Sequence, residues 1–424
     1  MTATRMVTAL FVFFCGALLA SAGSAVPTAS PQTVGMSKAR LDRISVAMQR
    51  YVDRKEVPGV VTLVARHGKV VHFEAQGSRW VEENAPMEKD TIFRIASMTK
   101  PITSVALMML HEEGHFLLTD PISKWLPEYS EMKIAIPSGA EYAGVPYRTV
   151  TSEVPISVRH ILTHTAGFPN SYRGLTQGEF AKISPRQSDD ETIGDFVTRQ
   201  ASLPLNFEPG TNWEYSRATD VVGRLVELIS GQTLDDFFME RIFEPLDMDD
   251  THFFLPEEKL DRFAAQYAPN EDGTIKLADA PTAESRFVKE PHVYFMGAGG
   301  LMSTATDYWR FHQMMLNGGK LGNTRILGRK TVELMTANHT GDLPIWLTGP
   351  GYGFGLGYSV VTDHGEAGVT TSNGTFGWGG AFCTYFWVDP VEDVVGIVMT
   401  QVRPYTHLNI RQEFAVLVNQ AIVD

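Results

Sequence analysis

Two serine–lysine pairs in the chain have the spacing that can turn a serine hydroxyl into a nucleophile. In the pattern Ser-x-x-Lys both side chains lie on one face of a helix, so the lysine amine can accept the hydroxyl proton. The amine does so only if its pKa falls from about 10.4 toward 7. The pattern occurs at Ser97 and Lys100 and again at Ser130 and Lys133. About one match is expected by chance in a chain of this length, so spacing alone does not locate a site.

The surrounding sequence favours the first pair. Ser97 follows a strand-like segment at 91–95 and precedes an apolar helix pattern at 101–113. The pair would therefore lie at the beginning of a helix, where free backbone N–H groups surround it. Burial and the positive helix end would lower the pKa of Lys100. The second pair lies in the polar stretch 128–153, which is expected to be a long surface loop. The alternative for the first pair is a helix-capping serine beside a solvated lysine.

Three other arrangements are weaker candidates. The nucleophile elbow Gly-x-Ser-x-Gly is absent, and its nearest approach, at Ser37, is better explained as a helix cap. His160 and His164 stand four residues apart, but no third ligand has convincing spacing, so no metal is predicted. Cys383 lies in the apolar run 381–387, where a small buried side chain is its ordinary role. No cofactor is predicted.

Strand patterns at both ends of the chain predict the framework for this site. Apolar runs at 60–65 and 70–75 flank a His-Gly-Lys turn, which predicts a hairpin of two strands. Strand-like runs return at 376–388 and 394–400. We expect the segments from both ends to join into one antiparallel sheet.

Helices are predicted beside this sheet and between its two halves. Helical spacing follows Ser37 and closes the chain at 408–422. The predicted fold class is α/β (α+β), with an antiparallel sheet flanked by helices. The sheet subdomain covers about 37–95 plus 295–424, and the inserted, mostly helical subdomain covers about 96–294.

The composition is that of a globular protein with an export signal. Of 424 residues, 43% are hydrophobic and 20% are charged. Arg5 precedes an apolar stretch at 7–20 that is too short to span a bilayer with these flanks, and small residues follow it. We expect residues 1–25 to be a signal peptide and 26–424 to be the catalytic domain, periplasmic or secreted. An uncleaved membrane anchor is the alternative.

Signal removal would change the cysteine content and the charge. Cys15 would leave with the signal, so Cys383 would remain alone and no internal disulfide could form. Loss of Arg5, and of no acidic residue, moves the net charge from −13 to −14. This acidity argues against nucleic acid or an anionic membrane as a partner.

Four stretches of the sequence resemble one enzyme family. The segment 93–100, Phe-Arg-Ile-Ala-Ser-Met-Thr-Lys, is similar to the active-site segment of the class C β-lactamase-like superfamily, particularly the family VIII carboxylesterases. Stretches at 160–167, 208–216 and 299–307 resemble signature stretches of the same family and fall in the expected order. The resemblance implies a β-lactamase/transpeptidase-like fold in which Ser97 is the nucleophile.

Two further motifs of the family match in part. Tyr215 stands where the superfamily has the tyrosine of Tyr-x-Asn, but Arg217 replaces the asparagine. Arg217 could orient a polar substrate or face solvent, and its presence puts β-lactam amide recognition in doubt. Trp378, Gly379 and Gly380 stand where β-lactamases have Lys-Thr-Gly, as they commonly do in the esterases. The resemblance therefore favours an esterase.

The resemblance also implies a mechanism, acyl transfer from a small carboxylic ester. Ser97 attacks the carbonyl, Lys100 and Tyr215 jointly remove its proton, and Tyr215 returns a proton to the leaving alkoxide. By resemblance, the oxyanion lies between the backbone N–H groups of Ser97 and Ala381. The alternatives are a β-lactamase or D-Ala-D-Ala peptidase, an acyltransferase, and a penicillin-binding or sensor protein without turnover.

Overall fold

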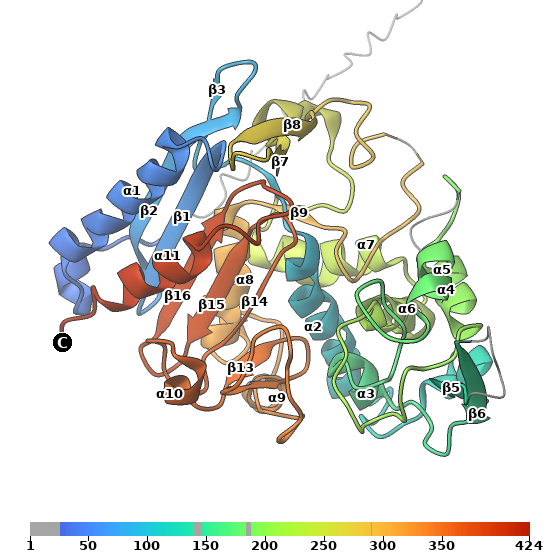
Figure 1. Ribbon diagram of the computed structural model, residues 1–424. Helices are drawn as coiled ribbons and strands as arrows, with labels where there is room; N and C mark the ends of the chain where they lie inside the picture. The colour runs from blue at the N-terminus through green and yellow to red at the C-terminus, as the bar shows by residue number, and fades with distance from the viewer. Residues whose placement is uncertain (1–25, 140–145, 184–187, 290) are drawn as a thin grey trace, which may run out of the picture.

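The computed structural model describes residues 26–139, 146–183, 188–289 and 291–424 (Figure 1). The predicted signal peptide, residues 1–25, lies outside the described residues. Within the described ranges, no helix is long and apolar enough to cross a membrane. The boundary at residue 26 and the division into two subdomains stay predictions.

An eight-stranded antiparallel sheet is built from both ends of the chain, as predicted (Figure 1). β1 (Gly59–Arg66) forms a hairpin with β2 (Lys69–Trp80) and pairs on its other side with β16 (Val394–Met399). The order across the sheet is β12-β13-β14-β15-β16-β1-β2-β3. The remaining strands are β3 (Ala85–Pro86), β12 (Tyr352–Phe354), β13 (Ser359–Val361), β14 (Phe376–Gly379) and β15 (Tyr385–Asp389).

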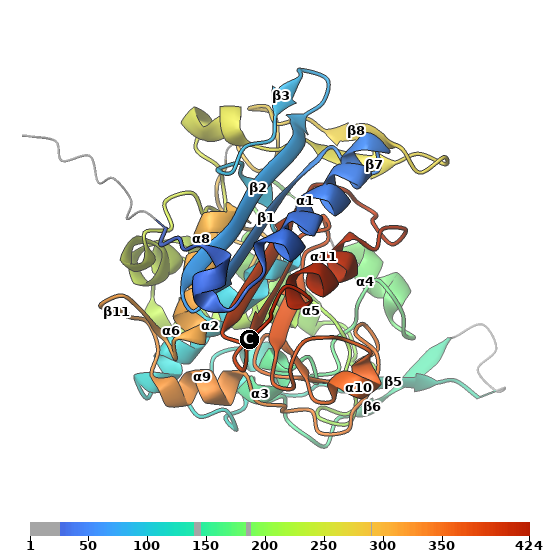
Figure 2. The same cartoon turned by 90° about the vertical axis from the view of Figure 1, so that its left-hand side faces the viewer.

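Helices cover both faces of the sheet, which explains why β1 is buried along its whole length. Successive side chains of a strand point to opposite faces. Leu63 packs in the core shared with α8 (Ala305–Leu316), whereas Val64 packs in the core shared with α1 (Lys38–Asp53) and α11 (Ile410–Asn419). Figure 2 shows α1 and α11 side by side across the second face.

The middle of the chain is mostly helical, and α2 lies at its centre. α2 (Thr99–Glu112) is buried from Thr99 to Leu110 and packs against α6 (Ala218–Ser230). In Figure 1 it runs between the sheet and the other helices of this part. An apolar helix can lie inside a protein when neighbours cover it all round. The other α-helices of this part are α3 (Val158–Leu162), α4 (Gln177–Ile183), α5 (Ile193–Ala201) and α7 (Leu234–Phe238). Two short helices, α9 (Arg329–Met335) and α10 (His364–Ala367), lie in the C-terminal part of the chain.

The expectation of a long surface loop at 128–153 is wrong. β5 (Lys133–Pro137) and β6 (Tyr147–Thr151) form an antiparallel hairpin in this stretch. Ile134 is buried and its backbone pairs with that of Leu205, so even a polar stretch gains a half-buried strand. Three more short pairs complete the strands: β4 (Phe93–Arg94) with β9 (Met302–Ser303), β7 (Gln266–Pro269) with β8 (Ile275–Asp279), and β10 (Lys320–Leu321) with β11 (Thr324–Arg325).

The strand-like run 376–388 is two strands rather than one. β14 ends at Gly379, and the chain turns before β15 begins at Tyr385. In this turn Cys383 has a φ of 69°, which belongs to the left-handed region and cannot continue a strand. The turn brings the end of β14 back toward the segment that precedes α2, where Gly380 lies against the Ile95 carbonyl.

Candidate active site

Only the first of the two serine–lysine pairs is close enough to react. Ser97 lies in a 3-10 turn, Ala96–Met98, directly before α2, and its Oγ is 3.2 Å from the Nζ of Lys100. In the second pair, Ser130 and Lys133 are both exposed, and Lys133 is the first residue of strand β5. The extended backbone of β5 turns that lysine away, because the one-face relation of i and i+3 holds only in a helix.

The turn that carries Ser97 is held in an uncommon conformation. Ala96 has a φ of 44°, a value that side-chain-bearing residues rarely adopt. β4 ends two residues earlier, and the Ile95 N–H donates to the Leu301 carbonyl at 3.1 Å. The sharp change from strand to helix places the Ser97 hydroxyl ahead of α2 rather than along it.

Lys100 is a buried amine with few partners. Its side chain is buried, and besides Ser97 its Nζ donates to the Ala298 carbonyl at 2.5 Å. Burial disfavours the charged ammonium and lowers the pKa of Lys100 to about 7. A large fraction of the amine is therefore neutral at neutral pH, which is the form that can accept a proton.

Tyr215 approaches the same serine from the other side. Its hydroxyl donates to Ser97 Oγ at 2.7 Å and lies 3.4 Å from the indole Nε1 of Trp378. The Lys100 Nζ lies 4.8 Å from the centroid of the tyrosine ring. Burial raises the pKa of Tyr215 to about 12, so its hydroxyl is protonated at neutral pH and can give a proton.

The end of β14 closes the site. A Cβ added to Gly380 would lie 2.3 Å from the Ile95 carbonyl oxygen, so a glycine is needed for this approach. A Cβ at Gly379 would meet the end of the Arg411 side chain instead. In the described part of the chain, the backbone N–H groups of Ser97 and Ala381 donate to no protein acceptor. Both predicted oxyanion donors are therefore free.

Arg217 does not face solvent, contrary to one of the two roles considered for it. Its side chain is 22% exposed, forms an ion pair with Asp220, and donates to the Tyr294 hydroxyl at 3.0 Å. Asp220 is fully buried, and its other oxygen accepts the Ala298 N–H. Sequence reasoning missed Asp220, because one acidic residue within a helix gives no signal of its own.

Aromatic rings line one side of the site. Trp213 stacks on Tyr215 with ring centroids 6.2 Å apart, and Tyr172 and Trp346 lie 6.3 Å apart. The Tyr172 ring is also 6.3 Å from that of Tyr215 and is largely exposed. Sequence reasoning found only a general aromatic content here, because Tyr172 and Trp346 lie in loops far apart in the chain.

The two histidines serve different structural purposes. His160 Nδ1 accepts the Ser157 N–H at 3.2 Å and caps α3. His164 is buried with its ring centroid 5.0 Å from that of Tyr215, and burial holds its pKa well below the ordinary range. Among the described residues, no three His, Cys, Asp or Glu side chains gather as metal ligands would.

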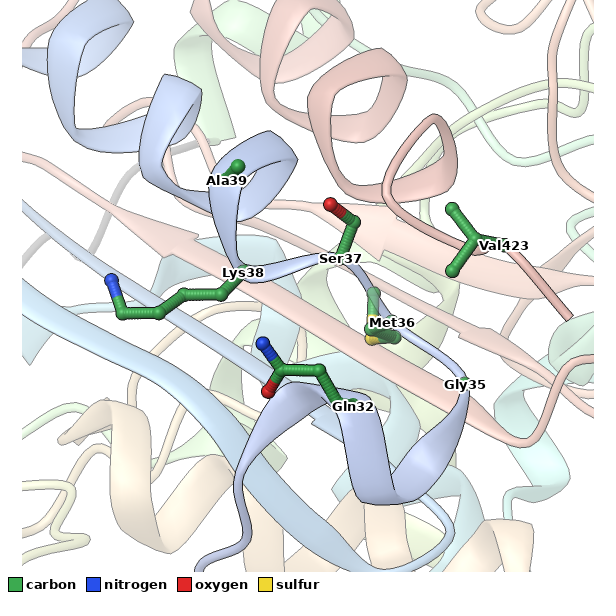
Figure 3. Close-up of a pocket in the computed structure, with 7 residues that line it drawn as sticks. All are labelled: Gln32, Gly35, Met36, Ser37, Lys38, Ala39 and Val423. Carbon is green, nitrogen blue, oxygen red and sulfur yellow. The ribbon is translucent and has the colours of Figure 1, made fainter.

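The side chains of Cys383 and Ser37 take no part in this group of reacting residues. Cys383 is buried, and burial raises the pKa of its thiol to about 11, which disfavours a reactive thiolate. Ser37 precedes α1 without a side-chain capping bond. It lines a hollow of about 360 Å³ beside Val423 (Figure 3), and the neighbouring Lys38 amine is paired with Asp42. Among the described residues that line this hollow, none offers a free base to Ser37.

Comparisons with known proteins agree with the fold and the motifs. The model of the β-lactamase family matches residues 45–419. The chain is 32% identical to esterase EstB of Burkholderia gladioli over 398 residues, which are 90% of this chain and 94% of EstB. It superposes with a TM-score of 0.75 on EstCE1, a hydrolase with promiscuous acyltransferase activity, at 26% identity, covering 91% of this chain and 99% of EstCE1.

A third comparison supports the fold alone. Simvastatin synthase LovD of Aspergillus terreus superposes with a TM-score of 0.76 at 22% identity, over 90% of this chain and 98% of LovD.

The fold and the family match define a serine hydrolase with the β-lactamase/transpeptidase-like architecture. The chain belongs to the β-lactamase family. Its relatives in that family include an enzyme named as an esterase, EstB, in agreement with the resemblance of the motifs to family VIII carboxylesterases.

Proposed function

We propose that the chain is a carboxylesterase that hydrolyses small esters through an acyl-enzyme on Ser97. One observation carries this proposal: the Ser97 Oγ is within hydrogen-bonding distance of both the Lys100 amine and the Tyr215 hydroxyl. A nucleophile, a base of near-neutral pKa and a proton donor therefore meet at one atom. No cofactor is required for this chemistry.

In the acylation step the Ser97 oxygen bonds to the ester carbonyl carbon. Its proton passes to the Lys100 and Tyr215 pair, which share it as coupled groups. The oxyanion accepts hydrogen bonds from the free N–H groups of Ser97 and Ala381. The bond to the alcohol oxygen then breaks, and Tyr215 gives a proton to the leaving alkoxide.

In the deacylation step a water molecule attacks the acyl carbon. The same pair takes the proton of the water, the Ser97–acyl bond breaks, and Ser97 recovers its proton as the carboxylic acid leaves. Gly379 and Gly380 let the substrate approach the oxyanion donors closely. Trp378 supplies an apolar wall and a hydrogen bond to Tyr215.

An ester is favoured over a β-lactam or peptide for two reasons. Arg217, bound to Asp220, stands where β-lactamases present an asparagine amide, so the amide-recognising group is missing. Trp378 stands where they present Lys-Thr-Gly. The relative EstB is named an esterase, and EstCE1 is described as a hydrolase with acyltransferase activity. Acyl transfer to an alcohol is therefore the second candidate.

The test compares purified wild type, Ser97→Ala and Ser130→Ala on p-nitrophenyl esters, nitrocefin and a D-Ala-D-Ala peptide. Ser130 is the matched control, since it belongs to the second Ser-x-x-Lys pair and is exposed. We expect ester turnover to exceed that of nitrocefin and peptide, Ser97→Ala to abolish it, and Ser130→Ala to keep it. Added alcohol separates transferase from esterase by its product. Undiminished ester cleavage by Ser97→Ala would refute the mechanism.

We also propose that residues 1–25 are a signal peptide and that residues 26–424 act in the periplasm or outside the cell. The sequence pattern of Arg5, the apolar stretch and the small residues after it supports this proposal. Mass spectrometry of the protein recovered from the periplasmic and culture fractions would test it. An intact N-terminus on membrane-bound protein would favour the uncleaved anchor.

A further inference from the structure

The backbone of Ala298 connects Lys100 to a buried ion pair. Its carbonyl accepts the Lys100 Nζ–H at 2.5 Å, and its N–H donates to Asp220 Oδ1 at 2.9 Å. The second oxygen of Asp220 accepts from the Arg217 guanidinium. A continuous chain of hydrogen bonds therefore runs from Arg217, through Asp220 and one residue of backbone, to the amine beside Ser97.

The segment 297–301 is fixed by α2 at both ends. Thr103 Oγ1 donates to the Gly297 carbonyl at 2.8 Å, and the Leu301 N–H donates to Thr99 Oγ1 at 3.1 Å. A Cβ on Gly297 would lie 2.8 Å from the Thr219 carbonyl, so α6 presses directly on the same segment. Asp220 holds the middle of this segment and thereby aims the Ala298 carbonyl at Lys100.

We infer that the Arg217–Asp220 ion pair is a positioning element for Lys100, which orients its amine and balances the charge beside it. The inference rests on the proposed function, because it concerns the base of that reaction. Arg217 stands where the family has an asparagine, and the inference gives this arginine a different role. It acts through Asp220 and Ala298 on Lys100 and does not contact the substrate.

The electrostatic effects of the two residues on Lys100 are opposite. Burial is the main cause of the lowered pKa of Lys100, Asp220 raises that pKa, and Arg217 lowers it. A buried carboxylate alone would favour the ammonium form, which cannot accept a proton. The guanidinium restores the balance, so that the amine stays available near neutral pH.

Among the described residues, the other titratable groups close to Lys100 are neutral. His164, beyond α3, has a pKa well below the ordinary range because of burial, and Tyr215, ahead of α6, has a pKa raised to about 12. Tyr294, on the segment before Gly297, binds Arg217 through its hydroxyl, and burial raises its pKa as well. Arg217 and Asp220 are therefore the charges that set the state of the amine.

The experiment is the pH dependence of kcat/KM for a p-nitrophenyl ester between pH 5 and 9, for charge-changing variants of the pair. At low pH, kcat/KM falls as Lys100 becomes protonated, and this falling part of the profile is the acid limb. We expect Arg217→Gln to shift the acid limb to higher pH by about one unit, so that kcat/KM falls roughly tenfold at a given pH on the acid side. Asp220→Asn keeps an acceptor for Ala298 and should move the limb downward. The double variant should return it toward wild type, and Arg217→Lys should leave it close to wild type.

The control variant is Arg224→Gln, which breaks another arginine–carboxylate pair three residues apart on α6, with Glu227. Its limb should stay in place. Folded Arg217→Gln protein with a lower rate but an unmoved limb would overturn the inference, since a merely structural role predicts that result. If Arg217→Gln does not fold, the test uses the neutral double variant and Arg217→Lys instead. Acid limbs of these two variants that lie at a different pH from that of wild type would overturn the inference.

The two proposals fail in different ways. A wild type without ester turnover would refute the proposed function and the inference together. A wild type with turnover and an acid limb that no variant moves would refute only the positioning role of Arg217 and Asp220. Covalent labelling of Ser97 by a fluorophosphonate, followed against pH in the same variants, repeats the test without turnover.

Discussion

Substitution of Gly380 by alanine tests how the end of β14 contributes to the site. The added Cβ would lie 2.3 Å from the Ile95 carbonyl oxygen and 2.2 Å from Thr384 Oγ1. Neither neighbour can move freely, because Ile95 belongs to the turn that carries Ser97 and the Gly380 N–H binds the Thr384 carbonyl. The chain after β14 must therefore move away from Ser97.

The size of the effect follows from the required movement. Ordinary contact between these atoms needs roughly 3.5 Å, so the two segments must separate by about 1 Å. Such a shift moves the Ala381 N–H away from the oxyanion, and one lost donor lowers kcat by about 100-fold to 1,000-fold. KM should change much less, because the donor acts mainly on the transition state. Overpacking should also cost about 1–3 kcal/mol of stability.

The assay is kcat and KM on a short p-nitrophenyl ester, with thermal unfolding of the same samples. Gly379→Ala is the graded comparison, since its Cβ would meet the end of the flexible Arg411 side chain at 2.6 Å. Gly178→Ala is the neutral control, because its Cβ would enter open space. A Gly380→Ala protein with wild-type kcat and unfolding temperature would refute the argument from close approach.

Three further predictions concern single groups. First, kcat/KM should fall tenfold per unit as pH drops below about 7, because Lys100, whose pKa is about 7, becomes protonated; a flat profile from pH 5 to 9 would contradict this. Second, Tyr215→Phe should lower kcat/KM by about 100-fold to 10,000-fold on an alkyl ester but by less on a p-nitrophenyl ester, whose alcohol leaves without a proton. Equal losses on the two esters would mean that Tyr215 acts only on the Ser97 proton and not on the leaving group. Third, buried Cys383 should resist iodoacetamide until the protein unfolds, and rapid labelling of native protein would contradict its raised pKa.

Much of the fold could be predicted because its signals are local and periodic. The hairpin of β1 and β2 follows from two apolar runs around a His-Gly-Lys turn, and the structure pairs these two strands antiparallel on either side of His67 and Gly68. The pairing of β1 with β16 was expected only in outline, because no local signal specifies a partner over 300 residues away. The polar hairpin of β5 and β6 was missed, because burial of Ile134 against a distant backbone outweighs a polar composition.

The serine–lysine pair follows directly from the order of residues in the chain. Ser97 and Lys100 are three residues apart, so the helical turn that runs from Ala96 into α2 brings their side chains together. The family motifs likewise pointed to Tyr215 and to the Trp378-Gly-Gly stretch, because those stretches are contiguous in the chain. Motifs whose residues lie close together in the chain could therefore be identified without knowledge of the fold.

The environment of that pair, in contrast, depends on how distant segments pack in the folded chain. The lowered pKa of Lys100 comes from burial beneath α6 and the 297–301 segment, and the orientation of Arg217 comes from Asp220. Burial and long-range hydrogen bonds depend on which segments pack together, and residues almost 200 positions apart in the chain meet at this amine. The reacting groups could therefore be identified from the sequence, whereas tertiary packing sets their protonation states and the orientation of their side chains.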